Sequence, residues 1–262
     1  MPGCSEGTDT QRAKMLRTGI ASPPLLQSRR ARNSMTKFCL IVGCGTALLL
    51  LCACSSEFPT DTSKLQAAEA GYDAALLTTS LNEIEAWHVK NDTGVARILR
   101  SGKSKVSIEE AFTGSDCQPS DELKSLWSWR DGGVGPTPFV WYHDFLPLED
   151  ALSEYRWLRI NPLVRWDRHY IPILTFEGEW YAAYCGPEAG SAGPIAHYFL
   201  EDGGRIVSVN LTVFMANVAE AMRIGAVQWK NGAMVDDIQQ MYSIHQTNNP
   251  GYEFPYYVAA EN

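Results

Sequence analysis

The chain lacks the motifs that mark most hydrolases and metalloenzymes. It has no Gly-x-Ser-x-Gly, no His-Glu-x-x-His and no phosphate-binding glycine loop. Its five histidines are scattered, and no metal-ligand spacing joins them to a cysteine. Two pairs, His143 with Asp144 and Asp167 with His169, have groups suited to acid/base work, but no nucleophile or oxyanion donor accompanies them. We therefore predict no catalytic residue, no metal site and no cofactor.

Positive charge is scarce after the first 54 residues. The chain has 22 Lys/Arg and 30 Asp/Glu, of which residues 1–54 hold seven and two; this leaves 15 and 28, a net charge of −13 for the remainder. DNA and RNA phosphates would repel such a domain, so no nucleic-acid partner is expected. The acidity suits a basic protein partner, or it serves solubility alone.

No apolar run reaches the roughly 18 residues that a membrane-spanning helix needs. The longest, Phe38–Leu51, follows Met35 and Lys37 and leads into Leu51-Cys52-Ala53-Cys54. This stretch resembles a bacterial lipoprotein signal peptide, with residues 35–53 as the removed signal and Cys54 as the lipidated N-terminus. Residues 1–34 would then be an unstructured or non-native extension; the alternative is a long basic leader.

The lipoprotein resemblance also implies a location. Residues 54–62 would form a polar tether, and membrane contact would be made only through the N-terminal lipid. Ser55, rather than Asp, follows the acceptor cysteine. By the same resemblance, this favours the outer membrane of the bacterial envelope, facing the periplasm.

Cysteine is equally sparse in the mature part. Beyond Cys54, only Cys117 and Cys185 remain. In an oxidising compartment these two can pair as a disulfide. Because Cys185 ends an apolar strand, a buried free thiol is the open alternative.

Residues 63–226 read as one α+β domain with a mainly antiparallel sheet of about four to six strands flanked by helices. The strand pattern occurs in Tyr170–Phe176, Trp180–Cys185, Ile195–Leu200 and Arg205–Val209, with a short strand at Phe139–Tyr142. Gly178 can take the positive φ that a tight hairpin needs.

Capping residues predict the helix starts. Expected starts lie at Ser63, Ser80, Ser107, Ser120 and Pro147, and a closing helix with apolar Leu211 to Met222 ends at Gly225. Residues 227–262 are expected to form a C-terminal extension with a helix-like stretch at Met234–His245.

The order of several short motifs resembles the SUKH superfamily, which includes fungal cell-wall-synthesis regulators and bacterial immunity proteins. The motifs are Pro119–Leu123, Trp129–Gly133, Leu146–Leu148, Trp166 with Tyr170–Ile173, Gly178 and Gly193–Ile195. The resemblance covers Leu81 to about Ala226 and departs from the family at Asp131 and Gln118. It implies a SUKH-like, non-enzymatic domain that binds and neutralises a cognate toxin in the periplasm.

An acidic end of the sheet is the expected contact surface for such a partner. Its candidate residues are Trp166, Asp167, Glu177, Glu179, Glu201 and Asp202. Taken singly, each acidic residue is equally consistent with a solvated surface.

Tryptophans support a second interpretation, a structural envelope lipoprotein that binds cell-wall glycan or another envelope protein. Trp129, Trp141 and Trp166 lie at the ends of predicted elements, where they can line a groove. Four others lie on apolar stripes and are expected in the core: Trp87, Trp127, Trp157 and Trp180. An envelope hydrolase is the least supported alternative.

Overall fold

The computed structural model describes residues 62–135, 138–186, 190, 192–200 and 203–256. The signal-like segment, Cys54, nearly all of the tether, Glu201 and Asp202 lie outside these residues. Within the described part, no helix has the length and apolar character that crossing a membrane requires.

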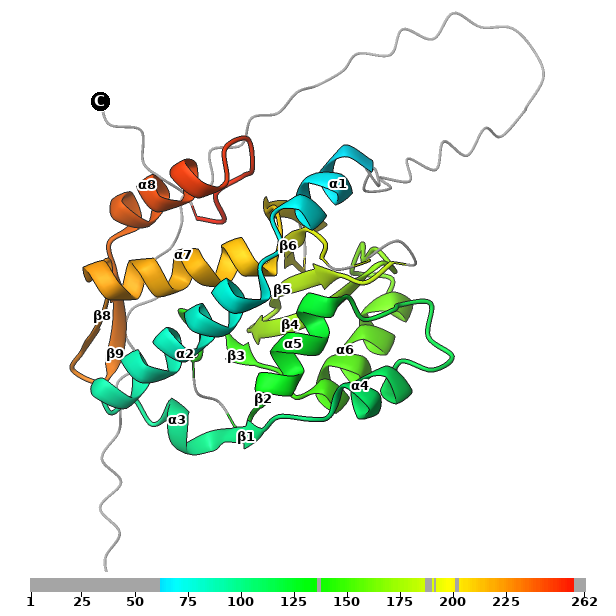
Figure 1. Ribbon diagram of the computed structural model, residues 1–262, viewed down its shortest axis with the longest axis horizontal. Coiled ribbons are helices and arrows are strands. Elements are labelled where there is room, and N and C mark those ends of the chain that lie inside the picture. The colour runs from blue at the N-terminus through cyan, green and yellow to red at the C-terminus, as the bar shows by residue number, and fades with distance from the viewer. Residues whose placement is uncertain (1–61, 136–137, 187–189, 191, 201–202, 257–262) are drawn as a thin grey trace, which may run out of the picture. The chain divides into compact units, whose positions relative to one another are not determined.

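A five-stranded antiparallel sheet forms the centre of the fold (Figure 1). Its strands lie in chain order: β3 (Asp144–Phe145), β4 (Tyr170–Phe176), β5 (Glu179–Tyr184), β6 (Ile195–Phe199) and β7 (Gly203–Ser208). The four long strands agree with the predicted segments to within two residues at each end. The predicted α+β class with an antiparallel sheet is therefore confirmed. The short strand predicted at Phe139–Tyr142 is wrong: Val140 and His143 form an isolated bridge around a turn, and β3 follows at Asp144.

Eight helices surround the sheet among the described residues: α1 (Thr62–Ala70), α2 (Ala74–Lys90), α3 (Val95–Ile98), α4 (Lys105–Ala111), α5 (Asp121–Trp129), α6 (Leu148–Ile160), α7 (Leu211–Ile224) and α8 (Ile238–Asn248). Two small two-stranded sheets complete the described fold: β1 (Leu99–Ser101) with β2 (Arg130–Gly133), and β8 (Val227–Lys230) with β9 (Ala233–Asp236).

Local capping explains where most helices begin and end. The Ser120 hydroxyl accepts a hydrogen bond from the Leu123 N–H (3.3 Å), as predicted, and Gly225 ends α7 in the left-handed conformation. The predicted start at Ser80 is wrong, because Asp73 caps α2 and Ser80 lies buried inside that helix. Helix α1 ends at Ala70 and α2 begins at Ala74, so α2 is already formed where the capping sequence at Ser80 occurs.

The β8–β9 hairpin was not predicted, and the helix expected from Met234 begins only at Ile238 because Met234 belongs to β9. Asn231 (φ 53°) and Gly232 (φ 80°) form its two-residue turn. Asn-Gly is the preferred sequence for such a turn, so the signal was present in the chain. Met234 of β9 and Met241 of α8 are buried in the main core, so residues 227–256 pack as part of this fold.

Both faces of the sheet are covered. One face packs against α2, α5 and α7 through Ile171, Ile173, Tyr181, Ile195 and Val207. The other face presents Tyr170, Trp180, Ala182, Tyr184 and Tyr198 to Leu158 of α6 and Leu65 of α1. Helices α2 and α7 run side by side, and α8 lies along α7 (Figure 1).

A disulfide joins Cys117, in the segment before α5, to Cys185, directly after β5. Both cysteines are fully buried. The bond ties the segment that leads into α5 to the central strand, 68 residues away.

Candidate functional site

Trp166 and Asp167, expected at a contact surface, are held by neighbours in their own domain. The Trp166 indole N–H donates to the Tyr170 carbonyl (2.9 Å), and its ring stacks on Tyr198 with centroids 4.1 Å apart. The Asp167 carboxylate accepts from the His169 backbone N–H (2.9 Å). Both side chains are half-buried, and Trp166 packs against the apolar cluster that Tyr170, Trp180 and Tyr198 form on the α6 side of the sheet.

Two of the tryptophan predictions are wrong. Trp141, expected at a groove, is buried, and its ring packs on Tyr181 and Phe214. Trp157, expected in the core, has 46% of its surface exposed on α6. The stripe of α6 that turns inward is formed by Leu148, Ala151, Leu152, Tyr155 and Leu158, and Trp157 falls outside it.

The tips of two hairpins lie side by side, although Glu201 and Asp202 of the predicted acidic end lie outside the described residues. The Leu200 backbone N–H donates to the Gly178 carbonyl (3.0 Å), which joins the β6–β7 tip to the β4–β5 turn. Glu177, in that turn, is exposed. Three large apolar side chains are also exposed here: Tyr142 (42%), Phe176 (37%) and Leu200 (40%). We call Tyr142, Phe176, Glu177 and Leu200 the tip face.

Tyr142 and Phe176 are in ring contact, with centroids 6.0 Å apart. Phe176, the last residue of β4, and Leu200, directly after β6, lie beside the Glu177–Gly178 turn. The tip face therefore exposes aromatic and aliphatic side chains, which are typical of the centre of a protein-binding surface, beside a carboxylate that suits its polar rim.

Glu179, two residues after Glu177, turns inward instead. Its Oε2 atom lies 3.5 Å from Nε2 of His197 and 3.8 Å from Nε2 of His143. One nitrogen of each ring and one carboxylate oxygen all lie within 4.8 Å of one another. We call these three residues the His-His-Glu cluster.

Aromatic rings enclose the two histidines. Tyr181 stacks on His197 with centroids 4.3 Å apart and meets His143 edge-on at 4.7 Å. Phe176 and Phe199 contact the outer sides of the histidine rings. Burial is the largest influence on both histidines: it lowers the pKa of His143 to about 3 and lowers the pKa of His197. Both rings are therefore neutral at physiological pH.

The sequence did not reveal this cluster, and no metal site was predicted. His143 precedes β3, Glu179 begins β5 and His197 lies in the middle of β6, so the pairing of three separate segments brings them together. One signal was available: His197 alternates in phase with Ile195 and must face the same core as that residue. A histidine at such an inward position needs a partner.

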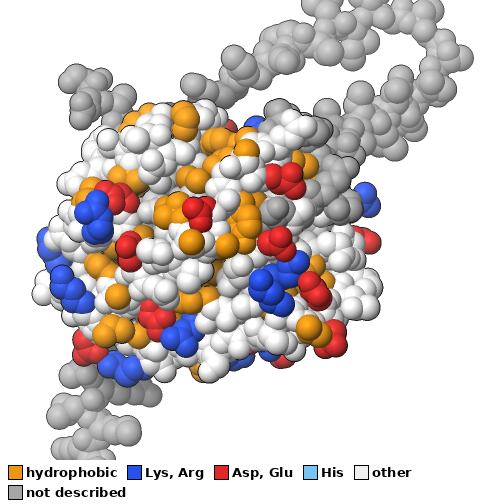
Figure 2. All heavy atoms as spheres, viewed as in Figure 1, with side chains coloured by type: hydrophobic (Ala, Val, Ile, Leu, Met, Phe, Trp, Pro, Cys, Tyr) orange, Lys and Arg blue, Asp and Glu red, His pale blue; other side chains and the backbone are white. Residues whose placement is uncertain are grey.

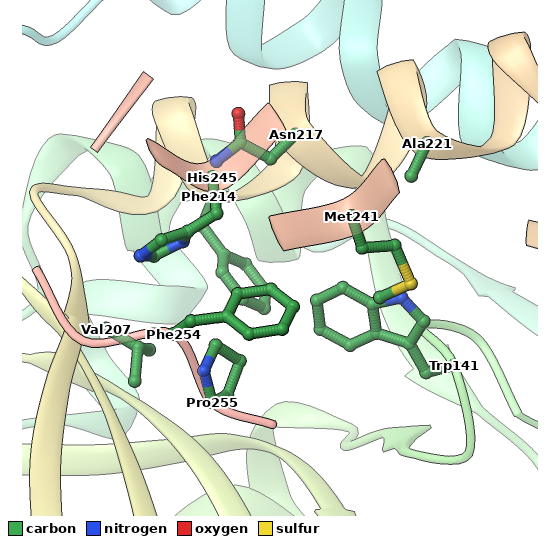
Figure 3. A pocket seen from close by; sticks show the side chains of 9 residues that line it. All are labelled: Trp141, Val207, Phe214, Asn217, Ala221, Met241, His245, Phe254 and Pro255. Carbon is green, nitrogen blue, oxygen red and sulfur yellow. The ribbon is translucent and has the colours of Figure 1, made fainter. Parts of the chain in front are cut away.

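A small apolar cavity lies between α7, α8 and the Phe254–Pro255 segment (Figure 3). Trp141 in its wall packs on Tyr181, which contacts both histidines of the cluster. The rings of Trp141, Phe214 and Phe254 gather around it, and its volume is about 20 Å³. A space of this size holds about one water molecule. It is therefore a gap in the core and too small for an organic ligand.

The face formed by α2, α7 and α8 has no single-sign charge field. Figure 2 shows acidic and basic side chains interspersed with apolar ones over this face. Arg223 and Glu220 form an ion pair there at 2.6 Å. This surface therefore favours neither nucleic acid nor a strongly charged partner.

Comparison of the chain with protein-family models gave no match, and a search of curated proteins found no similar protein. The resemblance to the SUKH superfamily stays a prediction that rests on the order of motifs in the sequence.

Proposed function

We propose that this chain is a lipid-anchored protein of the bacterial envelope that binds a basic protein partner through the tip face. The partner class proposed is a toxin, which the domain would neutralise by binding, in the manner of SUKH-type immunity proteins. No catalytic step is proposed. The anchor would be the lipid on Cys54.

The observation that carries the proposal is the tip face itself. Tyr142, Phe176 and Leu200 expose apolar surface around one turn, and Glu177 adds an outward carboxylate. Aromatic side chains anchor many interfaces, and nearby charges of the opposite sign speed association. The net charge of −13 on residues 55–262 adds a long-range attraction for a basic partner.

A pull-down from envelope extract with the purified full chain tests this function. The tip variant carries Phe176→Ser and Glu177→Lys. The matched control carries Val106→Ser and Glu110→Lys, the same two kinds of change at exposed positions of α4. We expect the wild type and the control to recover the same basic protein, and the tip variant to lose it by at least about tenfold.

The recovered protein then decides between immunity and other binding. Expressed in the periplasm without this chain, a toxin partner should stop growth, and co-expression of the chain should restore it. Equal recovery by the tip variant would contradict the proposed surface. Recovery of peptidoglycan instead of protein would favour the glycan-binding alternative.

A further inference from the structure

We propose that His143, Glu179 and His197 form a binding site for a divalent transition-metal ion of the zinc class. The ligands would be one ring nitrogen from each histidine and one carboxylate oxygen. This inference concerns the interior side of the hairpin tips and does not depend on the proposed partner.

The spacing of the three groups fits such an ion. Zinc binds histidine nitrogen and carboxylate oxygen at about 2.0–2.2 Å in a tetrahedral arrangement, so neighbouring ligand atoms lie roughly 3.4 Å apart. The two nitrogen–oxygen distances from Glu179 are 3.5 and 3.8 Å, and all three ligand atoms lie within 4.8 Å. Small side-chain rotations would complete the geometry.

The histidines also lack other partners. Their side chains are only 2% and 1% exposed, and, apart from the approach of Glu179 to Nε2 of His197 at 3.5 Å, the ring nitrogens have no hydrogen-bond partner among the described residues. Buried polar groups without partners are costly and uncommon in folded proteins. A metal ion would satisfy one nitrogen of each ring and would neutralise the Glu179 charge beside them.

The same residues indicate which ions fit and how the site is reached. Two imidazoles and one carboxylate suit Zn²⁺, Co²⁺, Ni²⁺ or Fe²⁺, whereas Mg²⁺ and Ca²⁺ prefer oxygen ligands. The Glu179 side chain is 35% exposed, which gives the ion a path from solvent. Three protein ligands leave a fourth position for water or for a group of a bound molecule.

The second nitrogen of each histidine has no hydrogen-bond partner among the described residues. Tightly held metals have outer hydrogen bonds that orient each histidine ligand. We therefore expect an exchangeable ion that a chelator removes without unfolding the domain.

Titration of the chelator-treated full chain with Co²⁺ tests the site, with absorption of the bound ion as the readout. Glu179→Gln removes a ligand charge and preserves the shape of the side chain. Glu177→Gln is the matched control, because Glu177 lies two residues earlier, in the turn before β5, and is exposed. Because cysteines elsewhere in the chain also bind Co²⁺, the difference between wild type and Glu179→Gln is the signal. We expect the wild type to bind about one Co²⁺ ion per chain more than Glu179→Gln does, and Zn²⁺ to displace this ion.

Loss of a direct ligand should weaken binding at least about tenfold, since even outer-shell changes weaken metal sites by 10–100-fold. Glu177→Gln should bind Co²⁺ as tightly as the wild type does. Zn²⁺ should also raise the unfolding temperature of the wild type and of Glu177→Gln more than that of Glu179→Gln. Equal Co²⁺ binding and equal Zn²⁺ stabilisation in all three proteins would overturn the proposal and leave a simple buried His–Glu contact. If the site fails this test while the tip variant still loses its partner, only the metal inference falls.

Discussion

The carboxylate of Glu122, on α5, caps the start of α7 at Thr212, 90 residues further along the chain. Its Oε1 atom accepts from the Thr212 backbone N–H (2.7 Å) and hydroxyl (2.6 Å), and its Oε2 accepts from the Leu211 N–H (3.1 Å). The first N–H groups of a helix have no partner within the helix, and a negative charge there also complements the helix dipole. Glu122 is 1% exposed, so this cap ties two core helices together.

Replacing Glu122 by alanine should destabilise the fold by about 2–4 kcal/mol, because two buried backbone donors and a hydroxyl lose their acceptor. Urea unfolding measures the change. Asp121→Ala is the matched control, since the neighbouring half-exposed carboxylate pairs with Lys124 at the surface and should contribute less than about 1 kcal/mol. Equal effects of the two substitutions would contradict the capping role.

Glu122 should also influence the pH dependence of stability. Burial raises its pKa from 4.5 to about 7, against the opposing effect of its hydrogen bonds. The folded state therefore holds the proton more tightly than the unfolded chain. The contribution of this group to stability is full below pH 4.5 and is lost as the pH rises through about 7. The stability of wild type minus that of Glu122→Gln should fall by about 3 kcal/mol from pH 4.5 to 7.5.

His88 should change the pH dependence of stability in the opposite direction from Glu122. One ring nitrogen bonds the Phe139 carbonyl (2.8 Å) and the other the Thr93 hydroxyl (2.8 Å), which suits a neutral ring. Burial lowers its pKa from 6.5 to about 4. Its stabilising contribution is therefore present above pH 6.5 and lost as the pH falls through about 4. The free energy of unfolding of the wild type, minus that of His88→Gln, should fall by about 3 kcal/mol as the pH falls from 6.5 to 4, as measured by urea unfolding. A difference that does not change with pH would argue against a buried neutral ring.

The Cys117–Cys185 disulfide closes a 68-residue loop. By the chain-entropy model, a loop of this length stabilises the fold by about 4 kcal/mol. The double variant Cys117→Ser/Cys185→Ser should show this loss in denaturant unfolding. A reductant should shift the wild-type transition by a similar amount and leave the double variant unchanged; a wild type insensitive to reductant would rule out the bond.

A comparison of Gly132 with Gly114 distinguishes the cost of a positive φ from the cost of a steric clash. Both have positive φ, +69° and +78°. A Cβ at Gly132 would lie 2.2 Å from the Pro147 nitrogen, whereas one at Gly114 would meet nothing within 4 Å. Gly114→Ala should therefore cost about 1–2 kcal/mol through conformation alone. Gly132→Ala should cost at least about 2 kcal/mol more in thermal unfolding, because the Pro147 backbone must move.

Local signals in the sequence predicted most of the secondary structure. Ser120 and Gly225 mark helix boundaries, and Gly178 marks the central hairpin, because each acts on backbone groups a few residues away. The error at Ser80 has the same origin: a capping signal is local and does not show that a helix already runs through it.

The candidate sites were less predictable. Glu177 and Glu179 look equivalent in the sequence, yet Glu177 is exposed and Glu179 lies against two histidines. Glu179 begins β5 and pairs with Phe176 across the hairpin, whereas Glu177 lies in the turn itself with a φ of 43°. The neighbouring strand β6 and the segment before β3 then bring His197 and His143 to Glu179.

By itself, the sequence determined the α+β class, the four long strands, the acidic charge of the part after residue 54 and the hairpin tips that form the tip face. These follow from periodicity, turn residues and composition, which are properties of short segments. Only the tertiary structure decided that Glu122 caps α7, that Cys117 meets Cys185, and that His143, Glu179 and His197 converge. Each of these contacts joins segments that are distant in sequence, so the packing of the sheet and helices brings them within reach.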